Sequence, residues 1–224
     1  EEIDLYNNFP FNRKTYIHQT PVVKPGDRFR KGQLLARSNY TDDQGRTALG
    51  LNAKVAYIPW KGLNFEDAIV VSEGFADRSA SEHMYQHEVE VTPKTKLRKR
   101  SFVSLFPGKF DKNALSAIDD TGVVKEGTEV NFGDPLILTA RERERSQNKI
   151  HKKRQAGYED RSILWNHHDS GVVTDVFHGK KGPVVLVKAT SKTKVGDKLS
   201  GRFGDKGVIS AVIPDSQMPH SADG

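Results

Sequence analysis

A short recurring pattern constrains this chain most: an apolar residue, a short spacer and a Gly-Asp pair precede an apolar segment. The pattern occurs at Val23 to Asp27, Val130 to Asp134 and Val195 to Asp197. Glycine adopts the positive φ that tight turns need, and an Asp side chain can bond back to the nearby backbone. The pattern therefore predicts repeated β-turns between short strands in barrel-like or sandwich-like units.

The composition fits such a fold. Apolar residues make up 35% and charged residues 29% of the 224 residues, and glycine occurs 19 times against 10 prolines. The apolar runs are short and interrupted by glycine, which favours a mainly β fold with few short helices over a helical bundle. No run approaches the roughly 20 apolar residues that a membrane-spanning helix needs. The absence of cysteine excludes disulfides and thiolate metal sites, and we expect a cytoplasmic protein.

The net charge and the two ends of the sequence lead to two expectations, one about the partner and one about the length of the whole protein. The formal net charge is +6, which raises the expectation of a polyanionic partner. The chain opens at Glu1 rather than at a methionine and stops at Gly224 without a terminating element. We therefore expect a piece of a longer protein or one part of a split subunit.

Several segments are predicted to be strands. Residues 15–20 are β-prone, and residues 55–60 predict a short buried strand closed by proline. Residues 171–177 and 183–187 predict a hairpin whose turn is Gly179 to Gly182.

The middle of the chain differs from its two ends in its sequence patterns. Asp119 to Gly122 predicts a hairpin turn between short strands. Residues 141–155 alternate in charge and lack apolar periodicity, which favours a solvated helix or a mobile loop. A nucleic-acid contact is the less favoured alternative there.

Two adjacent carboxylates, Glu66 and Asp67, stand directly before an apolar run. Because Mg²⁺ takes oxygen ligands, this pair could help to hold the ion directly or through its waters. Adjacent side chains point to opposite faces of a strand, so both could reach one ion only if the backbone turns there. On the residues alone, an ordinary solvated turn before a strand is the favoured alternative.

A glycine-dense loop at residues 195–207 carries Lys198, Arg202 and Lys206 at intervals of four. Cations among glycines suit phosphate binding, with lysine acting as a point charge and arginine as a planar fork. The loop lacks the Gly-Lys-Ser/Thr ending of a Walker motif, and a basic surface loop is the alternative. A nucleophile elbow, a catalytic triad and a histidine metal-ligand spacing do not stand out.

At these two places the sequence resembles the β (second-largest) subunit of multisubunit DNA-dependent RNA polymerases, and the resemblance is collinear over nearly the whole chain. The stretches that carry it are Pro21 to Gln33, Ala48 to Asn52, Pro59 to Ile69, Ser72-Glu73, Ile118 to Asp134, Val195 to Lys198, Gly201-Arg202, Lys206 to Ser210, Met218-Pro219 and Asp223-Gly224. The resemblance implies a double-psi β-barrel formed by residues 1–81 and 171–224. It also implies a flap-like, sandwich- or barrel-like subdomain inserted at residues 82–170.

The resemblance further implies a nucleotidyltransferase that works only within a complex. The principal catalytic Mg²⁺ of this family is held by the partner β′ subunit, and no Asp-x-Asp-x-Asp run occurs here, so the chain alone should be inactive. Lys198 and Lys206 match the lysines that approach the RNA 3′ end and the incoming nucleoside triphosphate (NTP). Glu66 and Asp67 match positions that support a second, nucleotide-borne Mg²⁺. Arg202 is expected to help with phosphate binding or loop structure.

The implied partners are the β′ subunit, the remaining β segments, an α-like assembly subunit or initiation factor, the DNA template, nascent RNA and NTPs, with no membrane. Phe203 and Asp205 stand where bacterial members usually have His and Asn, and the spacer between the two signatures is short. These departures indicate a divergent polymerase with a trimmed flap. A phage genome is one source, which would place the protein in the host cytoplasm or the virion. The alternatives are a non-catalytic nucleic-acid-binding β-barrel module and a structural assembly module.

Overall fold

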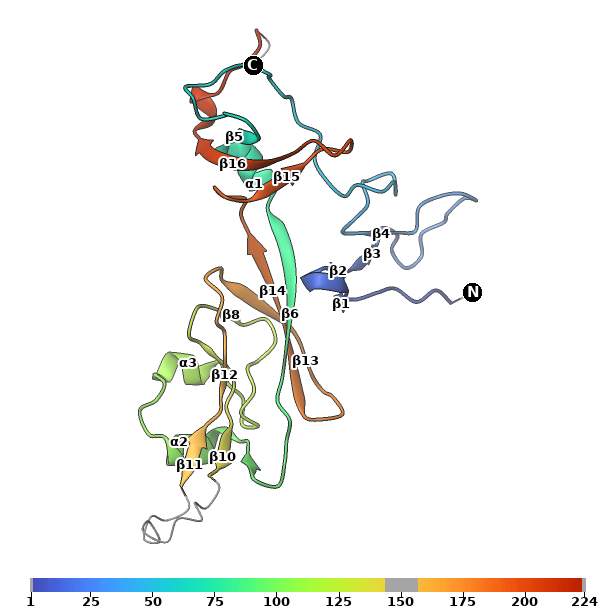
Figure 1. Ribbon diagram of the computed structural model, residues 1–224. Helices are drawn as coiled ribbons and strands as arrows, with labels where there is room; N and C mark the ends of the chain where they lie inside the picture. The colour runs from blue at the N-terminus through green and yellow to red at the C-terminus, as the bar shows by residue number, and fades with distance from the viewer. Residues whose placement is uncertain (1, 144–156, 223–224) are drawn as a thin grey trace. The chain divides into compact units, whose positions relative to one another are not determined.

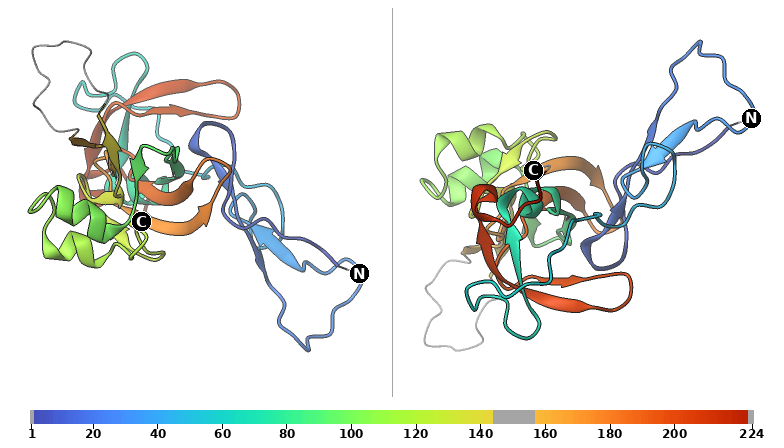
Figure 2. Two further views of the ribbon diagram at one scale, coloured as in Figure 1. Left: turned by 90° about the horizontal axis from the view of Figure 1, so that it is seen from below. Right: turned by 90° about the horizontal axis from the view of Figure 1, so that it is seen from above.

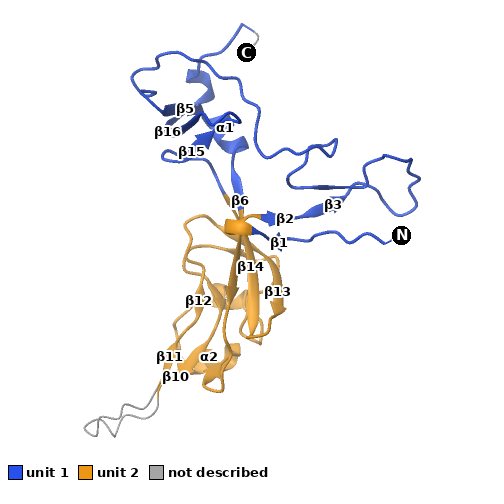
Figure 3. Ribbon diagram, turned by 45° about the vertical axis from the view of Figure 1, so that its right-hand side comes forward, with its two compact units in different colours: residues 1–11, 16–82, 191–224 blue, residues 12–15, 83–190 orange. Residues whose placement is uncertain are grey.

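The computed structural model describes residues 2–143 and 157–222 and is mainly β, as predicted (Figure 1). The described residues form three short α-helices: α1 (Glu73–Arg78), α2 (Lys99–Leu105) and α3 (Lys112–Ser116). None of the helices in these ranges is long and apolar enough to cross a membrane. The chain divides into two compact units (Figure 3): unit 1 holds residues 1–11, 16–82 and 191–224, and unit 2 holds residues 12–15 and 83–190.

Unit 1 contains short antiparallel pairs and one three-stranded sheet. Its strands are β1 (Phe9–Pro10), β2 (Tyr16–Ile17), β3 (Gln19–Pro21), β4 (Ala36–Ser38), β5 (Ala68–Ser72), β15 (Lys198–Ser200) and β16 (Lys206–Ile213). Strands β1 and β2 pair, as do β3 and β4, and the larger sheet has the order β15-β16-β5. A 3₁₀ turn, η3 (Asp215–Gln217), follows β16.

Unit 2 is built around a four-stranded sheet of order β6-β14-β13-β8. Its remaining sheets have the orders β11-β10-β7 and β12-β9. The strands are β6 (Ser81–Glu88), β7 (Thr95–Lys96), β8 (Glu129–Val130), β9 (Pro135–Ile137), β10 (Ala140–Glu142), β11 (Tyr158–Asp160), β12 (Ile163–Leu164), β13 (Gly171–His178) and β14 (Pro183–Ser191), with a 3₁₀ turn η1 (Asn12–Lys14). Strands β6 and β14 each cross the boundary between the units by one or two residues.

The larger core lies in unit 2. It centres on Trp165, Phe102 and Ile137, which are almost completely buried. Strand β13 contributes Val173 to it, and β14 contributes the alternating residues Val185 and Val187. Helices α2 and α3 lie next to each other (Figure 2). Burial of these apolar side chains is the main source of stability for a β unit of this size.

The recurring Gly-Asp pattern forms the same turn at all three places, which confirms that prediction. In each turn the glycine has a φ between +90° and +93°. The Asp N–H donates to the carbonyl three residues earlier, and the Asp carboxylate accepts the N–H of that same residue. The carboxylate bonds are Lys24 N to Asp27 Oδ2 at 2.8 Å, Asn131 N to Asp134 Oδ2 at 2.7 Å and Lys194 N to Asp197 Oδ2 at 2.9 Å.

Other local predictions are confirmed as well. Of residues 15–20, residues 16–17 lie in β2 and residues 19–20 lie in β3, and β13 and β14 form the expected hairpin across Gly179 to Gly182. Asp119 closes the predicted 119–122 turn, because its carboxylate accepts the N–H groups of Thr121 and Val123.

The predicted buried strand at residues 55–60 is wrong. Residues 51–57 form no strand, and Val55 and Tyr57 are 69% and 92% exposed. The segment is apolar enough to be a strand, but no neighbouring strand in the described residues pairs with it. Of the charged run at residues 141–155, Arg141 and Glu142 belong to β10, and residues 144–155 lie outside the described residues.

Candidate functional site

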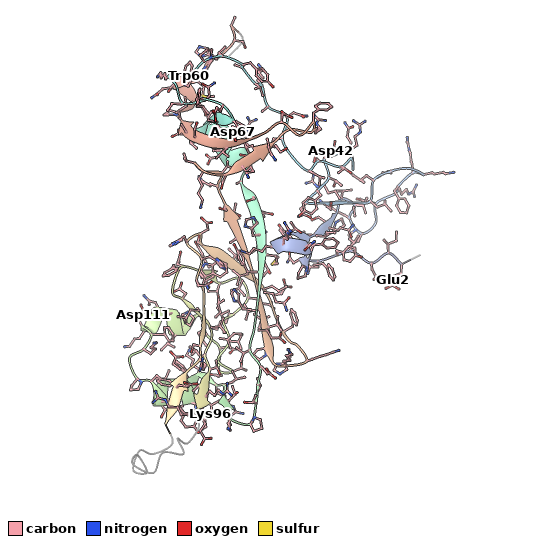
Figure 4. The ribbon with its side chains drawn as sticks, in the orientation of Figure 1. Glu2, Asp42, Trp60, Asp67, Lys96 and Asp111 are labelled. Atoms are coloured by element: carbon pink, nitrogen blue, oxygen red, sulfur yellow. The ribbon has the colours of Figure 1, made fainter. Side chains whose placement is uncertain are left out.

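The sheet β15-β16-β5 brings together the two segments that the sequence analysis singled out. Strand β16 pairs in parallel with β5, with Val208 opposite Ala68 and Ile209 opposite Ile69. The backbone N–H of Val208 donates to the Asp67 carbonyl at 2.9 Å. The start of β16 therefore lies beside the turn that ends at Asp67, which is labelled in Figure 4.

The two predicted lysines share one face of the sheet. Strands β15 and β16 are antiparallel, with Lys198 opposite Val208 and Ser200 opposite Lys206. Side chains alternate between faces, and directly opposed residues share a face, so Lys198 and Lys206 lie on the same side. Both residues are exposed.

The opposite face of this sheet covers a small core under α1. Ile209, Val71 and Ala76 are buried there, and Leu199 packs against them. The Ser72 hydroxyl caps α1 by accepting the Phe75 N–H at 3.0 Å. With this core on one face, Lys198 and Lys206 are exposed on the other.

Backbone bonds hold the loop of residues 195–207 at its start and at its tip. At its start, Gly196 N donates to Ile209 O at 2.8 Å, and Ile209 N donates to Asp197 O at 2.9 Å. At its tip, Gly201 N donates to Asp205 O at 3.2 Å, and Gly204 has a φ of +87°. Backbone hydrogen bonds therefore order the loop at its start and at its tip.

Arg202 lies in this tip and is held by an asparagine distant in sequence. Its Nη2 donates to the side-chain oxygen of Asn52 at 2.9 Å. Neighbouring Phe203 is fully exposed. The structure therefore gives Arg202 a structural contact within unit 1, in keeping with a part in shaping the loop.

The backbone turns at Glu66, as a shared role for the two carboxylates requires. Glu66 has a φ of +56°, a left-handed conformation that is uncommon for residues other than glycine. The preceding turn is organised by Asn64, whose side chain accepts Trp60 N at 2.8 Å and donates to Ile58 O at 2.7 Å. Glu66 and Asp67 are both exposed.

Ser210 and Gly207 join the halves of the site. Gly207 belongs to the predicted glycine-dense loop, whereas sequence reasoning gave Ser210 no role of its own. The Ser210 hydroxyl donates to Leu63 O and, at 3.3 Å, to Ile69 O. It sits where the β16–β5 register shifts between Ile209 and Ala211. Gly207 is buried, and a Cβ there would collide with Asp67 O and lie 2.6 Å from Ile69 Cδ1. A glycine at 207 thus permits the close approach, and Ser210 ties the acidic turn to the lysine strand.

The electrostatics of unit 1 include one acid outside the predicted set. The Gly74 backbone N–H donates to Asp215 Oδ1 at 3.0 Å. This bond, with a bond to Ser72 and the nearby Arg78 charge, lowers the pKa of the Asp215 carboxyl. Asp215 thus carries its charge at the first turn of α1, where it serves the helix rather than the lysine face.

The chain belongs to the family described as RNA polymerase Rpb2, domain 6, whose family model matches residues 2–224. Among its relatives, a protein of Clostridioides difficile (strain 630) named DNA-directed RNA polymerase subunit beta is 36% identical over 99% of this chain. Proteins of the same name from Mycoplasmopsis synoviae and Rubrobacter xylanophilus are 32% and 35% identical over 100% and 95% of the chain. In each case the match covers 20% of the relative, so the chain spans about a fifth of their length.

Proposed function

We propose that this chain is a part of the β subunit of a DNA-dependent RNA polymerase and supplies half of a nucleotidyl-transfer site. The observation that carries the proposal is the arrangement of the sheet β15-β16-β5. Lys198 and Lys206 lie on one face of this sheet, and the start of β16 lies beside the Glu66-Asp67 turn. The names of the relatives support it. In this role the chain contacts the incoming NTP, its Mg²⁺ and the RNA 3′ end during template-directed synthesis.

The exposed cations suit the chemistry. Phosphoryl-type transfer depends on positioning and on neutralising the charge that develops on phosphate oxygens. Lys198 and Lys206 are exposed on the face away from the α1 core, where their ammonium groups can approach phosphate. Arg202, bound to Asn52, would hold the loop that connects them.

Glu66 and Asp67 fit a partial ligand set for a nucleotide-borne Mg²⁺. They are exposed oxygen donors in a turn, and Mg²⁺ commonly keeps several waters and phosphate oxygens. Within residues 2–143 and 157–222, no group of three or more His, Cys, Asp or Glu side chains could hold an ion. The pair would therefore act directly or through water beside other ligands. The bound ion would supply neutralising charge to the phosphates, and the principal catalytic ion would belong to β′.

The division of the chain follows the same proposal. Residues 1–81 and 171–224 would contribute to the double-psi barrel, and residues 82–170 would form the flap-like insertion. Separation of residues 83–190 as a compact unit supports an insertion, although this unit also includes residues 171–190, which the proposed division assigns to the barrel. The proposed partners are β′, the remaining β segments, template DNA, nascent RNA and NTPs, with an α-like subunit or initiation factor in assembly. We place the complex in the cytoplasm, and a phage origin stays a prediction.

Magnesium dependence tests the carboxylates. We would reconstitute the polymerase with this segment and measure nucleotide addition on a primed RNA–DNA scaffold across Mg²⁺ concentrations. Glu66→Gln and Asp67→Asn should need more Mg²⁺ to reach half-maximal rate. Asp43→Asn is the control, because that carboxylate pairs with Arg37 in unit 1. If the rate depends on Mg²⁺ concentration in the same way for all variants, Glu66 and Asp67 do not take part in the site.

The second candidate is a non-catalytic nucleic-acid-binding module, which the net charge of +6 favours. It would bind nucleic acid as the isolated chain, with strong salt dependence. Its binding would be insensitive to Glu66→Ala, and it would need no partner subunit.

A further inference from the structure

The loop between β3 and β4 gathers cations that no acid of the described residues neutralises. Lys24, Arg28, Arg30 and Lys31 lie within eight residues, all exposed, and we call residues 24–31 the basic loop. The ion pairs and side-chain hydrogen bonds of the described residues include none of these four side chains. The carboxylate of Asp27 accepts the Lys24 backbone N–H at 2.8 Å.

The basic loop is held in shape by its backbone. It starts with the Gly-Asp turn of Lys24 to Asp27 and runs into a second turn from Arg30 to Gln33. In that turn, Gln33 N donates to Arg30 O at 3.0 Å, and the Gln33 side chain accepts Arg30 N at 3.2 Å. Gln33 thus takes the place that Asp holds in the other turns without adding a negative charge. The base of the loop is closed by the β3–β4 pair and by Val22 N donating to Leu35 O at 2.9 Å (Figure 1).

An aromatic side chain stands among the cations. Phe29 lies between Arg28 and Arg30 and is 63% exposed. Exposed aromatics interleaved with cations are typical of surfaces that bind single-stranded nucleic acid, since bases stack on the ring while the cations follow the phosphates. An ordered loop also loses less conformational entropy on binding than a disordered one.

We propose that the basic loop is a second nucleic-acid contact of this chain, which binds the phosphodiester backbone of a single strand and offers Phe29 for stacking. A single strand is the ligand that fits these side chains. Its phosphates complement the cations, and its unpaired bases can stack on the exposed ring, whereas the bases of a duplex are already stacked and paired. The inference rests on the proposed function, because a polymerase supplies the strand. The loop is separate in sequence from Lys198 and Lys206 and has no role in the transfer step.

The test uses the reconstituted polymerase containing this chain. Fluorescence anisotropy would measure the affinity for labelled single-stranded DNA, single-stranded RNA and duplex DNA of equal length between about 50 and 200 mM salt, a range wide enough to resolve counterion release. The variants are Arg28→Gln combined with Arg30→Gln, and Phe29→Ala. Arg37→Gln is the matched control, because its guanidinium already pairs with Asp43 in the same hairpin region.

The double variant should weaken single-strand binding and lower the slope of log K against log salt by about 1.4, because each phosphate that is no longer neutralised accounts for roughly 0.7. Phe29→Ala should weaken binding at least about fivefold with little change in slope. Arg37→Gln should match wild type, and the DNA and RNA arms identify which strand is preferred. Unchanged single-strand affinity in both variants would overturn the proposal.

Two further outcomes separate this inference from the proposed function. Loss of subunit assembly in the double variant would overturn the inference, because the loop would then serve a protein interface. Nucleotide addition at saturating scaffold should stay at the wild-type rate in the loop variants. If Lys206→Ala slows addition while the loop variants bind as wild type, the proposed function stands and the inference fails.

Discussion

At Gly207 the lysine strand and the acidic turn approach each other closely. A Cβ added there would collide with Asp67 O and crowd Ile69, so the two strands would have to separate. We expect Gly207→Ala to lower the free energy of unfolding by about 1–3 kcal/mol, as overpacking does. Gly50→Ala is the control, because nothing lies within 4 Å of its added Cβ. Urea unfolding that gives equal midpoints for both variants would contradict this close approach.

Lys198 and Lys206 differ in position along the hairpin although they share a face. Lys206 stands at the start of β16 beside Asp67, whereas Lys198 opens β15, the strand farther from β5. If both lysines serve phosphate, single alanine variants should each slow nucleotide addition without unfolding the sheet. Circular dichroism of the purified chain checks whether the variants keep the fold. If a variant loses its β-sheet signal to the same extent as its activity, the lysine has a structural role only.

At the scale of elements, Ser210 links β16 to the acidic turn. Ser210→Ala removes the hydrogen bonds to Leu63 O and Ile69 O, which should cost about 1 kcal/mol of stability. If the turn positions Glu66 for nucleotide, the variant should also raise KM for NTP more than it lowers kcat. Ser210→Thr retains the hydroxyl and should restore KM. A uniform loss of stability with unchanged KM would leave Ser210 with a structural role alone.

His87 on strand β6 is expected to make the stability of unit 2 depend on pH. Burial, with a smaller contribution from His167, lowers the pKa of His87 below its ordinary 6.5, and its Nε2 has no hydrogen-bond partner among the described residues. Burial and the Lys14 charge likewise lower the pKa of His167, while Asp169 opposes the shift. Both rings pack against Trp165, at 5.9 and 4.7 Å between centroids. The folded chain thus favours neutral rings.

Because the unfolded chain binds these protons at higher pH, stability should be full above about pH 6.5 and fall as the pH drops below that value. His87→Leu should reduce this pH dependence. His178→Gln, which changes an exposed residue at the end of β13, should not. Thermal unfolding between about pH 5 and 8 measures both, and a wild-type midpoint independent of pH would contradict the coupling.

The elements also show which features the sequence could predict. The Gly-Asp turns were predictable because glycine and a back-bonding Asp determine four residues locally. The prediction of a strand at residues 55–60 was wrong. A strand needs a hydrogen-bonded partner as well as apolar side chains, and no strand of the described residues pairs with that segment. The lysines and carboxylates were predictable as charged motifs. Their link through Ser210 was not, since Ser210 and Leu63 are 147 residues apart.

At the scale of the whole molecule, the chain is a fifth of the length of its relatives, and its proposed site is half of a larger one. The isolated chain should therefore add no nucleotide to a primed scaffold under conditions in which the reconstituted polymerase does. Activity of the isolated chain would contradict the division of the site between subunits.

The most direct test of the half-site is single-turnover nucleotide addition by the reconstituted polymerase with Lys206→Ala. Lys192→Ala is the control, because Lys192 forms a surface ion pair with Asp77, 2.9 Å away. We expect Lys206→Ala to slow addition by about 10²- to 10³-fold, the usual cost of removing one stabilising donor, at unchanged assembly and with the control near wild type. Addition by Lys206→Ala at the wild-type rate would make Lys206 a surface cation and contradict the proposed role of the lysine face.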